Sequence, residues 1–396
     1  MSFRPRIACF PALFFFLLFF PLSSSFSQQH VPAPADIVAG RDIFPIGVWL
    51  QDPGNAMAYK ALGINFYAGL WKGPTEKQLT QLQAAKMPVF AAQNALAMKP
   101  RYEDIIVGWM MPDEPDNAQL TEDGSLGPPV LPGTLIQQYH RMKETDPVRP
   151  ILLNLGQGVA WDQWYGRGTR TNHPEDYELY VKAADIVSFD IYPITHRDSG
   201  IRGRLDYVAR GVDRLVNWTG GSKPVWSIIE TSRVSNAEIM PTGEQIRSLV
   251  WLSIIHGARG IIYFVHQFTP YFVEASLLQN NALSQEVAEI NARLQSLAPI
   301  LNKKSTARIN INVTAPYDSV SILARQESCH LYIFAGSTSK FATEAQITIG
   351  GKMTATYVDV LDESRRVALQ EDQFQDTFAP YAVHLYRIPL TEENCT

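Results

Sequence analysis

The chain has 396 residues, of which 46% are hydrophobic and 18% are charged. This composition excludes an intrinsically disordered protein and allows a large buried core. The formal net charge of −5 disfavours a nucleic acid or another polyanion as the substrate or partner. The three cysteines are too few for a metal cluster, and Cys329 and Cys395 could form one disulfide or remain two thiols.

The first residues have the composition of a secretory signal peptide. Arg4 and Arg6 precede an apolar run at residues 10–22, and the small residues at 25–27 suit cleavage before Gln28. A membrane anchor is the alternative, but the run is short for a spanning helix, which needs about 20 apolar residues. We therefore expect residues 1–27 to be removed and the protein to be secreted or periplasmic. The net charge then becomes −7, since two arginines and no acidic residue are lost, and we expect no membrane span in the mature chain.

Residues 28–303 alternate between short apolar runs and segments with helical periodicity, which is typical of repeated βα units. The pattern predicts helices at 56–62, 76–85, 132–144, 175–183, 203–218 and 242–256, with no clear helix after the third strand. It predicts eight strands, at 43–49, 64–68, 88–92, 105–110, 150–155, 186–190, 224–229 and 260–265. Eight strands close a (β/α)8 barrel of the TIM type, whereas the alternative, an open doubly wound sheet, does not usually need eight consecutive parallel strands.

A helix at 282–297 is expected to close the barrel, and Pro299 marks a change of pattern. Residues 304–396 then show short alternating segments separated by Gly, Asp and Ser. The predicted strands lie at 308–313, 319–324, 330–335, 345–349, 355–360 and 382–388. They indicate a small antiparallel β-sandwich domain.

Two glutamates stand where a predicted barrel strand stops and a loop begins. Glu114 follows the fourth strand and Glu230 ends the seventh. The carboxyl ends of barrel strands carry catalytic groups, and the fourth and seventh strands face each other across the mouth. Two carboxyls can hydrolyse a glycosidic bond, with retention when they are about 5–5.5 Å apart and with inversion at about 6.5–9.5 Å. The alternative is that Glu114 caps a helix near Pro115 and that Glu230 forms an ion pair, for example with Arg233.

These residues resemble the clan A glycoside hydrolases, and the resemblance covers roughly residues 40–300. In that clan the acid/base usually appears as Asn-Glu, often followed by Pro, where this chain has Asp113-Glu114-Pro115. The resemblance implies a retaining double displacement with Glu114 as acid/base and Glu230 as nucleophile. It also implies that Asp113 accepts a hydrogen bond from a sugar hydroxyl and that Tyr192 bonds the nucleophile.

Other side chains near the strand ends are candidates for binding an oligo- or polysaccharide. Polar groups there could bind hydroxyls: Gln51, Gln93, Asn94, Asn154, Asp190, His266 and Gln267. Flat aromatic rings could stack on sugar rings: Trp49, Trp71, Trp109, Trp161, Trp164 and Tyr263. Of these, Trp161 and Trp164 are the preferred platforms, while Trp109 and Trp226 lie within strands and are expected in the core.

No His, Cys or Asp cluster has the spacing of metal ligands, and no glycine-rich stretch has the context of a phosphate loop. We therefore expect no metal and no other cofactor. The alternative function is a non-catalytic carbohydrate-binding protein on the same barrel, which Asp113 in place of Asn supports. The sequence leaves open the sugar, its linkage and the oligomeric state.

Overall fold

The computed structural model describes residues 37, 40, 42–303, 309–351 and 353–391, which belong to one compact unit that spans Val31–Thr396. The expected signal peptide, residues 1–27, lies outside the described residues. Within the described part, no helix combines the length and the apolar character needed to cross a bilayer.

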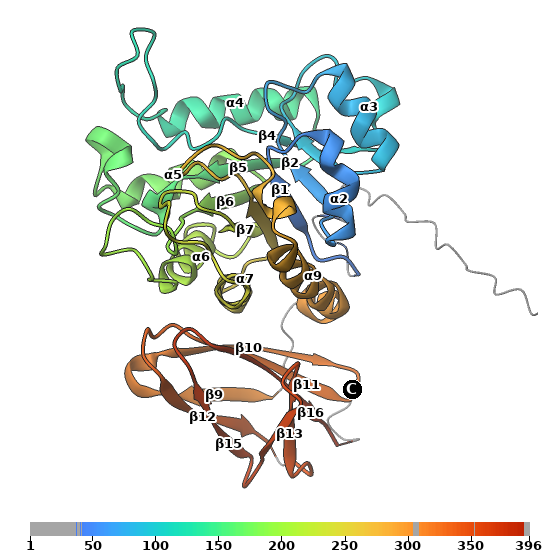
Figure 1. Ribbon diagram of the computed structural model, residues 1–396, viewed down its shortest axis with the longest axis vertical. Coiled ribbons are helices and arrows are strands. Elements are labelled where there is room, and N and C mark those ends of the chain that lie inside the picture. Colours follow the sequence, from blue (N-terminus) through green and yellow to red (C-terminus); the bar gives the residue numbers. More distant parts are fainter. Residues whose placement is uncertain (1–36, 38–39, 41, 304–308, 352, 392–396) are drawn as a thin grey trace, which may run out of the picture. The chain divides into compact units, whose positions relative to one another are not determined.

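The first part of the chain is a closed barrel of eight parallel strands, in which each strand pairs with the next and the eighth pairs with the first. Figure 1 shows these strands enclosed by the helices. The strands are β1 (Ile46–Trp49), β2 (Phe66–Ala68), β3 (Val89–Ala91), β4 (Ile106–Met110), β5 (Ile151–Leu155), β6 (Ile186–Asp190), β7 (Val225–Glu230) and β8 (Gly260–Phe264). The predicted fold class is confirmed, and the strands fall within the predicted segments apart from Glu230, which extends β7 by one residue.

Large aromatic rings fill the inside of the barrel. Trp226 packs against Phe66 and Phe90 with ring centroids 5.0 and 5.3 Å away. Two glycines make room for these rings, each from the strand next to the ring: a Cβ atom on Gly47 of β1 would lie 2.4 Å from the Phe66 ring on β2, and one on Gly108 of β4 would lie 2.1 Å from the Phe90 ring on β3. The interior is therefore a packed core, so a ligand can enter only at the ends of the strands.

Helices cover the outside of the barrel. They are α2 (Ala56–Ala61), α3 (Glu76–Ala85), α4 (Pro132–Thr145), α5 (Tyr177–Tyr180), α6 (Asp206–Trp218), α7 (Gly243–Ile255), α8 (Ser276–Gln279) and α9 (Asn281–Leu301). Thr75 and Thr242 begin α3 and α7 with capping boxes, which satisfy backbone N–H groups at the helix start.

Two helical segments differ from the prediction. The segment expected at 175–183 is broken into 3-10 turns, Pro174–Asp176 and Val181–Ala183, on either side of α5. The segment after β3 agrees with the prediction of no clear helix, since it forms only a 3-10 turn at Pro100–Tyr102. Helix α9 continues to Leu301, four residues beyond the predicted end, with Pro299 inside it.

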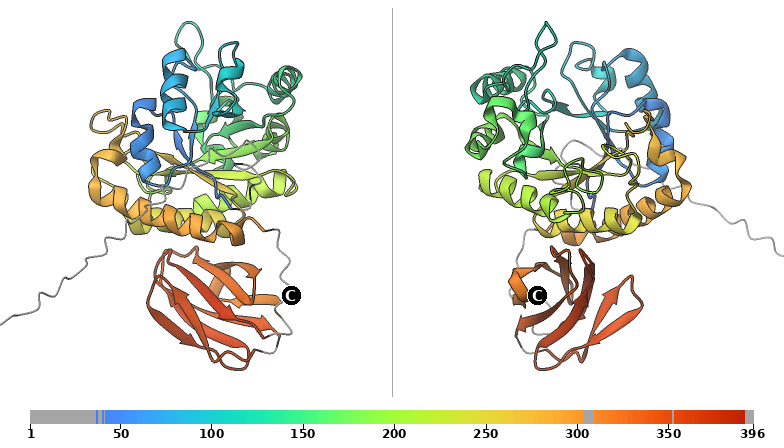
Figure 2. Two further views of the ribbon diagram at one scale, coloured as in Figure 1. Left: turned by 90° about the vertical axis from the view of Figure 1, so that its right-hand side faces the viewer. Right: turned by 60° about the vertical axis from the view of Figure 1, so that its left-hand side comes forward.

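The second part of the chain is a pair of antiparallel sheets, drawn in orange to red in Figure 2. The five-stranded sheet has the order β10-β11-β16-β13-β14, and the three-stranded sheet has the order β15-β12-β9. Their strands are β9 (Asn310–Thr314), β10 (Val320–Glu327), β11 (His330–Ser337), β12 (Thr343–Gly350), β13 (Tyr357–Leu361), β14 (Arg365–Ala368), β15 (Gln373–Phe378) and β16 (Val383–Pro389). The predicted sandwich is confirmed, but the prediction missed β14 and β15.

The sandwich packs against helix α7 of the barrel. Trp251 on α7 stacks on Phe334 of β11 with ring centroids 5.4 Å apart, and Arg247 Nη1 donates to the Val383 carbonyl at 2.8 Å. A Cβ atom on Gly336 would lie 2.9 Å from Leu252, so β11 approaches the helix closely. Cys329 is in a disulfide whose partner lies outside the described residues.

Candidate active site

A cavity of about 1000 Å³ opens at the carboxyl ends of the barrel strands. Seven of the eight loops that follow the strands contribute to it, together with part of α3. Its carboxyl groups include Asp113 and Glu114 after β4 and Asp190 at the end of β6. The aromatic side chains that line it are Trp49, Trp71, Trp164, Tyr192, Phe264, Phe268 and Phe272.

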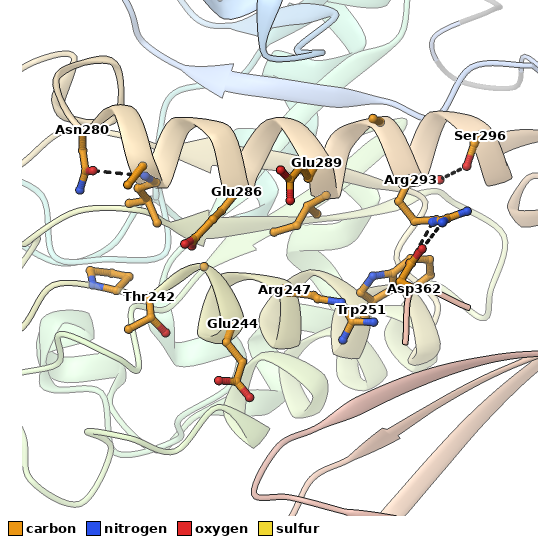
Figure 3. A pocket seen from close by; sticks show the side chains of 16 residues that line it. Thr242, Glu244, Arg247, Trp251, Asn280, Glu286, Glu289, Arg293, Ser296 and Asp362 are labelled. Carbon is orange, nitrogen blue, oxygen red and sulfur yellow. Dashed lines mark hydrogen bonds and ion pairs between the residues drawn. The ribbon is translucent and has the colours of Figure 1, made fainter. Parts of the chain in front are cut away.

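A second cavity, of about 1100 Å³, lies between α7 and α9 on the outside of the barrel (Figure 3). Here Glu286 lies against Gly243, and Arg293 forms an ion pair with Asp362. This cavity lies away from the strand ends, and its charged groups are spread along two helices. Convergence of polar groups rather than volume identifies an active site, and this criterion selects the cavity at the barrel mouth.

Glu114 is held in an uncommon backbone conformation at this mouth. Its φ angle is 40°, a left-handed value that is rare for residues other than glycine and that often marks functional positions. Its N–H donates to the Asn154 carbonyl on β5 at 3.1 Å, and Asn117 Nδ2 donates to its Oε2 at 2.9 Å. No helix begins at Pro115 in the described chain, so Glu114 is not a helix cap.

Asp190 faces Glu114 from the end of β6. Tyr192 donates its hydroxyl to Oδ2 of Asp190 at 2.9 Å. Oδ1 is buried and has no hydrogen-bond partner among the described residues, so it could accept a hydrogen bond from a protonated carboxyl. A side-chain hydrogen bond joins Asp190 to Glu114. Such a bond requires that one of the two carboxyls be protonated.

The surroundings decide where this proton lies. Burial raises the pKa of Glu114 well above its ordinary value, and the charge of Asp190 and the hydrogen bond to it raise this pKa further. Burial also raises the pKa of Asp190, but the hydrogen bonds from Glu114 and Tyr192 oppose that rise. These surroundings favour the proton on Glu114 over Asp190.

Asp113 is the third carboxyl of the group. Part of its surface faces the solvent in the cavity, yet the surrounding protein atoms and the charge of Asp190 raise its pKa to about 7. Asn154 Nδ2 donates to its Oδ1 at 2.9 Å, and Ser188 in turn donates to Asn154 Oδ1 at 2.9 Å. Asn154 therefore supports Asp113 from the strand layer and does not itself line the cavity.

Glu230 lies at the end of β7, as predicted, but it is closed off from the cavity. Its side chain is 0% exposed, and it is absent from the described residues that line the mouth. Ile194 N donates to Oε1 at 2.6 Å, while Thr195 donates its N–H at 3.1 Å and its hydroxyl at 2.6 Å to Oε2. Burial raises its pKa to about 7, although these three hydrogen bonds oppose the rise. Arg233 bonds Gln267 at 3.4 Å rather than forming the ion pair considered above.

The other predicted binding residues are divided between the mouth and the interior. Trp164 and His266 line the cavity together with Tyr192. Tyr263 is fully buried, and its hydroxyl donates to Asn291 on α9 at 2.8 Å. Its side chain therefore faces the surrounding helices rather than the mouth. Trp161 is buried behind Trp164, with ring centroids 5.8 Å apart.

Gln93 borders a smaller neighbouring cavity of about 340 Å³ that also touches Asp113, and its amide donates to the Met142 carbonyl at 3.1 Å. Trp109 and Trp226 are in the core, as expected. Within the described chain, no group of three or more His, Cys, Asp or Glu side chains is arranged to hold a metal ion.

Three phenylalanines that the prediction missed extend an aromatic wall from Tyr192 to the rim of the cavity. Phe264 lies 4.9 Å from Tyr192, and Phe268 and Phe272 follow it, with ring centroids 5.7 Å apart. His266 stacks on both of the outer rings. The position of these residues just beyond β8 was the available signal, because every loop at this end of a barrel can reach the mouth.

No protein-family model matches the chain, and no curated protein sequence matches it. Solved structures do resemble it. A proposed alpha-galactosidase from Bacteroides fragilis NCTC 9343 has a TM-score of 0.52 at 10% identity, over 90% of this chain and 80% of that chain. The fold is shared with glycoside hydrolases.

AmyP in complex with maltose has a TM-score of 0.49 at 9% identity, over 90% of this chain and 99% of that chain. A GH30 endoxylanase from Clostridium papyrosolvens C71 has a TM-score of 0.44 at 14% identity, over 88% and 97%. At such identities the similarity concerns the fold alone, so the chemistry has to be argued from the site.

Proposed function

We propose that the protein is a glycoside hydrolase that cleaves O-glycosidic bonds in an oligo- or polysaccharide. The observation that carries this proposal is the carboxyl pair at the barrel mouth, where Glu114 and Asp190 line the same cavity and the pKa of Glu114 is raised well above its ordinary value. Hydrolysis of a glycosidic bond needs one carboxyl that holds a proton and another that is charged. Different surroundings of the two groups produce this division.

Glu114 is the proton donor in this proposal. Burial and the charge of Asp190 raise the pKa of Glu114 well above the ordinary value, which favours the protonated form that can donate to the leaving oxygen and later accept a proton from water. Asn117, which bonds its Oε2, orients the group. We retain the expectation of a retaining double displacement, for which Glu114 and Asp190, which line the same cavity, would stand about 5–5.5 Å apart rather than the about 6.5–9.5 Å of an inverting pair.

The walls of the cavity suit a neutral or weakly charged glycan. The aromatic wall and Trp164 present flat apolar surfaces, on which the C–H faces of sugar rings can stack. Carboxyls crowd the floor, and they would repel an acidic sugar. We also propose that the protein is secreted, on the composition of its first 27 residues.

The test is hydrolysis of a panel of aryl α- and β-glycosides and polysaccharides by the wild type and by Glu114→Gln. Activity that falls about 10²- to 10⁴-fold in the variant, and falls least for substrates with the best leaving groups, supports the proposal. Glycan binding without hydrolysis of any substrate would instead identify a carbohydrate-binding protein.

A further inference from the structure

We propose that Asp190, rather than Glu230, is the nucleophile, and that Glu230 is a positioning residue for the segment that follows Asp190. This inference rests on the proposed function and specifies which side chain attacks the anomeric carbon. It replaces the role that the sequence suggested for Glu230.

Access to substrate separates the two carboxyls. A nucleophile must approach the reacting carbon to about 3–3.5 Å before attack. Asp190 lines the mouth cavity beside Glu114 and keeps 7% of its surface exposed. Glu230 lies behind residues 194–195, which would have to move before a sugar could reach it.

The hydrogen bonds distinguish the two groups in the same way. Both oxygens of Glu230 already accept bonds from Ile194 and Thr195. Asp190 accepts a bond from Tyr192 on Oδ2, while its buried Oδ1 has no hydrogen-bond partner among the described residues. Attack by Glu230 would break bonds that hold the backbone, whereas attack by Asp190 would use an oxygen that the backbone does not need.

Substrate binding can release this oxygen. The glycosidic oxygen takes the place of Asp190 as acceptor of the Glu114 proton, and Oδ1 is then free to attack. An electron pair on Oδ1 forms the bond to the anomeric carbon, the glycosidic C–O bond breaks, and the leaving oxygen takes the proton. In the second step Glu114 accepts a proton from water, the water oxygen bonds to the anomeric carbon, and the bond to Asp190 breaks. Both carboxyls return to their starting state.

Glu230 contributes through the backbone. Ile194 and Thr195 follow Asp190 and Tyr192 closely in the chain, and Glu230 fixes both of their N–H groups. The anchored segment holds Tyr192 against Asp190 Oδ2. Loss of Glu230 should therefore disturb the nucleophile by displacing its neighbours, without removing the attacking oxygen.

The decisive experiment is to trap the covalent intermediate. The wild type is first assayed with aryl glycosides to find the sugar that it hydrolyses, and the anomeric configuration of the product is determined by NMR. The enzyme is then treated with the 2-deoxy-2-fluoro glycoside of that sugar with a dinitrophenolate leaving group. Trypsin separates the candidate carboxyls, because Asp190 lies in the peptide 183–197, Glu230 in 215–233 and Glu114 in 102–141.

A fluoroglycosyl label on Asp190, located by mass spectrometry, is the expected result. A label on Glu230 or any other residue overturns the assignment, as does retention without a labelled carboxylate or a product of inverted configuration. A wild type that hydrolyses no glycoside overturns the proposed function itself. That result differs from hydrolysis with a label on Glu230, which overturns only the assignment of the nucleophile.

Rescue by azide provides a matched second test. Asp190→Gly should lose roughly 10⁴-fold or more of its turnover. Azide should restore part of it with an activated substrate by attacking from the vacated side, which gives a glycosyl azide of inverted configuration. Glu230→Gly, treated identically, should give no such product. A glycosyl azide from the Glu230 variant alone would overturn the proposal, while circular dichroism of both variants checks that they fold.

Discussion

The neighbouring strands β6 and β7 each end in an acidic side chain, Asp190 and Glu230, and the two side chains differ in their access to the cavity. Asp190 pairs in register with Ile228, so Glu230 stands two residues farther along the barrel. Glu230 is nevertheless the more deeply buried of the two, because residues 194–195 fold over it and donate three hydrogen bonds. The end of a barrel strand can therefore place an acidic side chain near the mouth. The loop that follows determines whether that side chain is accessible to a substrate or is enclosed by hydrogen bonds to the backbone.

Substitution of each carboxyl by its amide should give the largest difference between Asp190 and Glu230. Asp190→Asn should lower kcat on an aryl glycoside by roughly 10⁴-fold or more, because the attacking oxygen loses its charge. Glu230→Gln should lower it by only about 10- to 100-fold, through displacement of the site. Steady-state kinetics measure both, and equal losses would contradict the different roles.

The hydrogen bond from Tyr192 should influence the pKa of Asp190. Tyr192→Phe removes a hydrogen bond to the charged form of Asp190, so the pKa of this carboxyl should rise. The acidic limb of the pH profile of kcat/KM should then move to higher pH, with roughly a 10-fold loss at the optimum. A profile that keeps its acidic limb would show that Asp190 does not control that limb.

The free energy of unfolding should depend on pH because Glu230 is buried. Its pKa is raised from an ordinary value near 4.5 to about 7, so the folded state binds more protons than the unfolded state between these values. The resulting stabilisation is fully present below about pH 4.5 and is lost as the pH rises through about 7, with a size on the order of 3 kcal/mol. Urea unfolding at several pH values should show this fall in the wild type. Glu230→Gln should flatten it, and an unchanged slope would count against the assignment.

The smallest expected effect concerns the aromatic wall. Phe272 is 60% exposed and lines the cavity, while Tyr271 beside it is 67% exposed and is not among the described lining residues. Phe272→Ala should raise KM by about fivefold, since an aromatic contact contributes about 0.5–1.5 kcal/mol. Tyr271→Ala is the matched control and should leave KM unchanged. Similar effects of both substitutions would argue against a role of the wall in binding.

Much of the barrel could be predicted because each strand is buried on both faces and appears as an unbroken apolar run. The position of Glu114 could be predicted for the same reason, since the end of such a run is visible in the sequence. The burial of Glu230 beneath residues 194–195 could not be predicted. Two of the three groups that donate hydrogen bonds to Glu230 are backbone N–H groups, which almost any residue would supply. The sequence pattern therefore ranked Asp190 only among the hydroxyl-binding candidates.

The strands missed in the sandwich have a related explanation. Arg365 on β14 bonds both oxygens of Asp376 on β15, at 3.1 and 2.8 Å. This charged pair, which joins the two sheets, takes the place of some of the apolar alternation that makes a strand recognisable. Strand β14 also stands at the edge of its sheet, where one side of the strand is open and fewer residues are buried.

Helix α7 has a consequence for how the two parts of the chain depend on each other. Ten of its thirteen residues are buried, so it is apolar on nearly all sides, and the surface turned away from the barrel is covered by Phe334 and Gly336 of β11. A chain truncated after Leu301 would expose Trp251 and its neighbours to water as one continuous apolar stripe. Such a fragment should self-associate, which makes the sandwich the layer that shields this stripe from water.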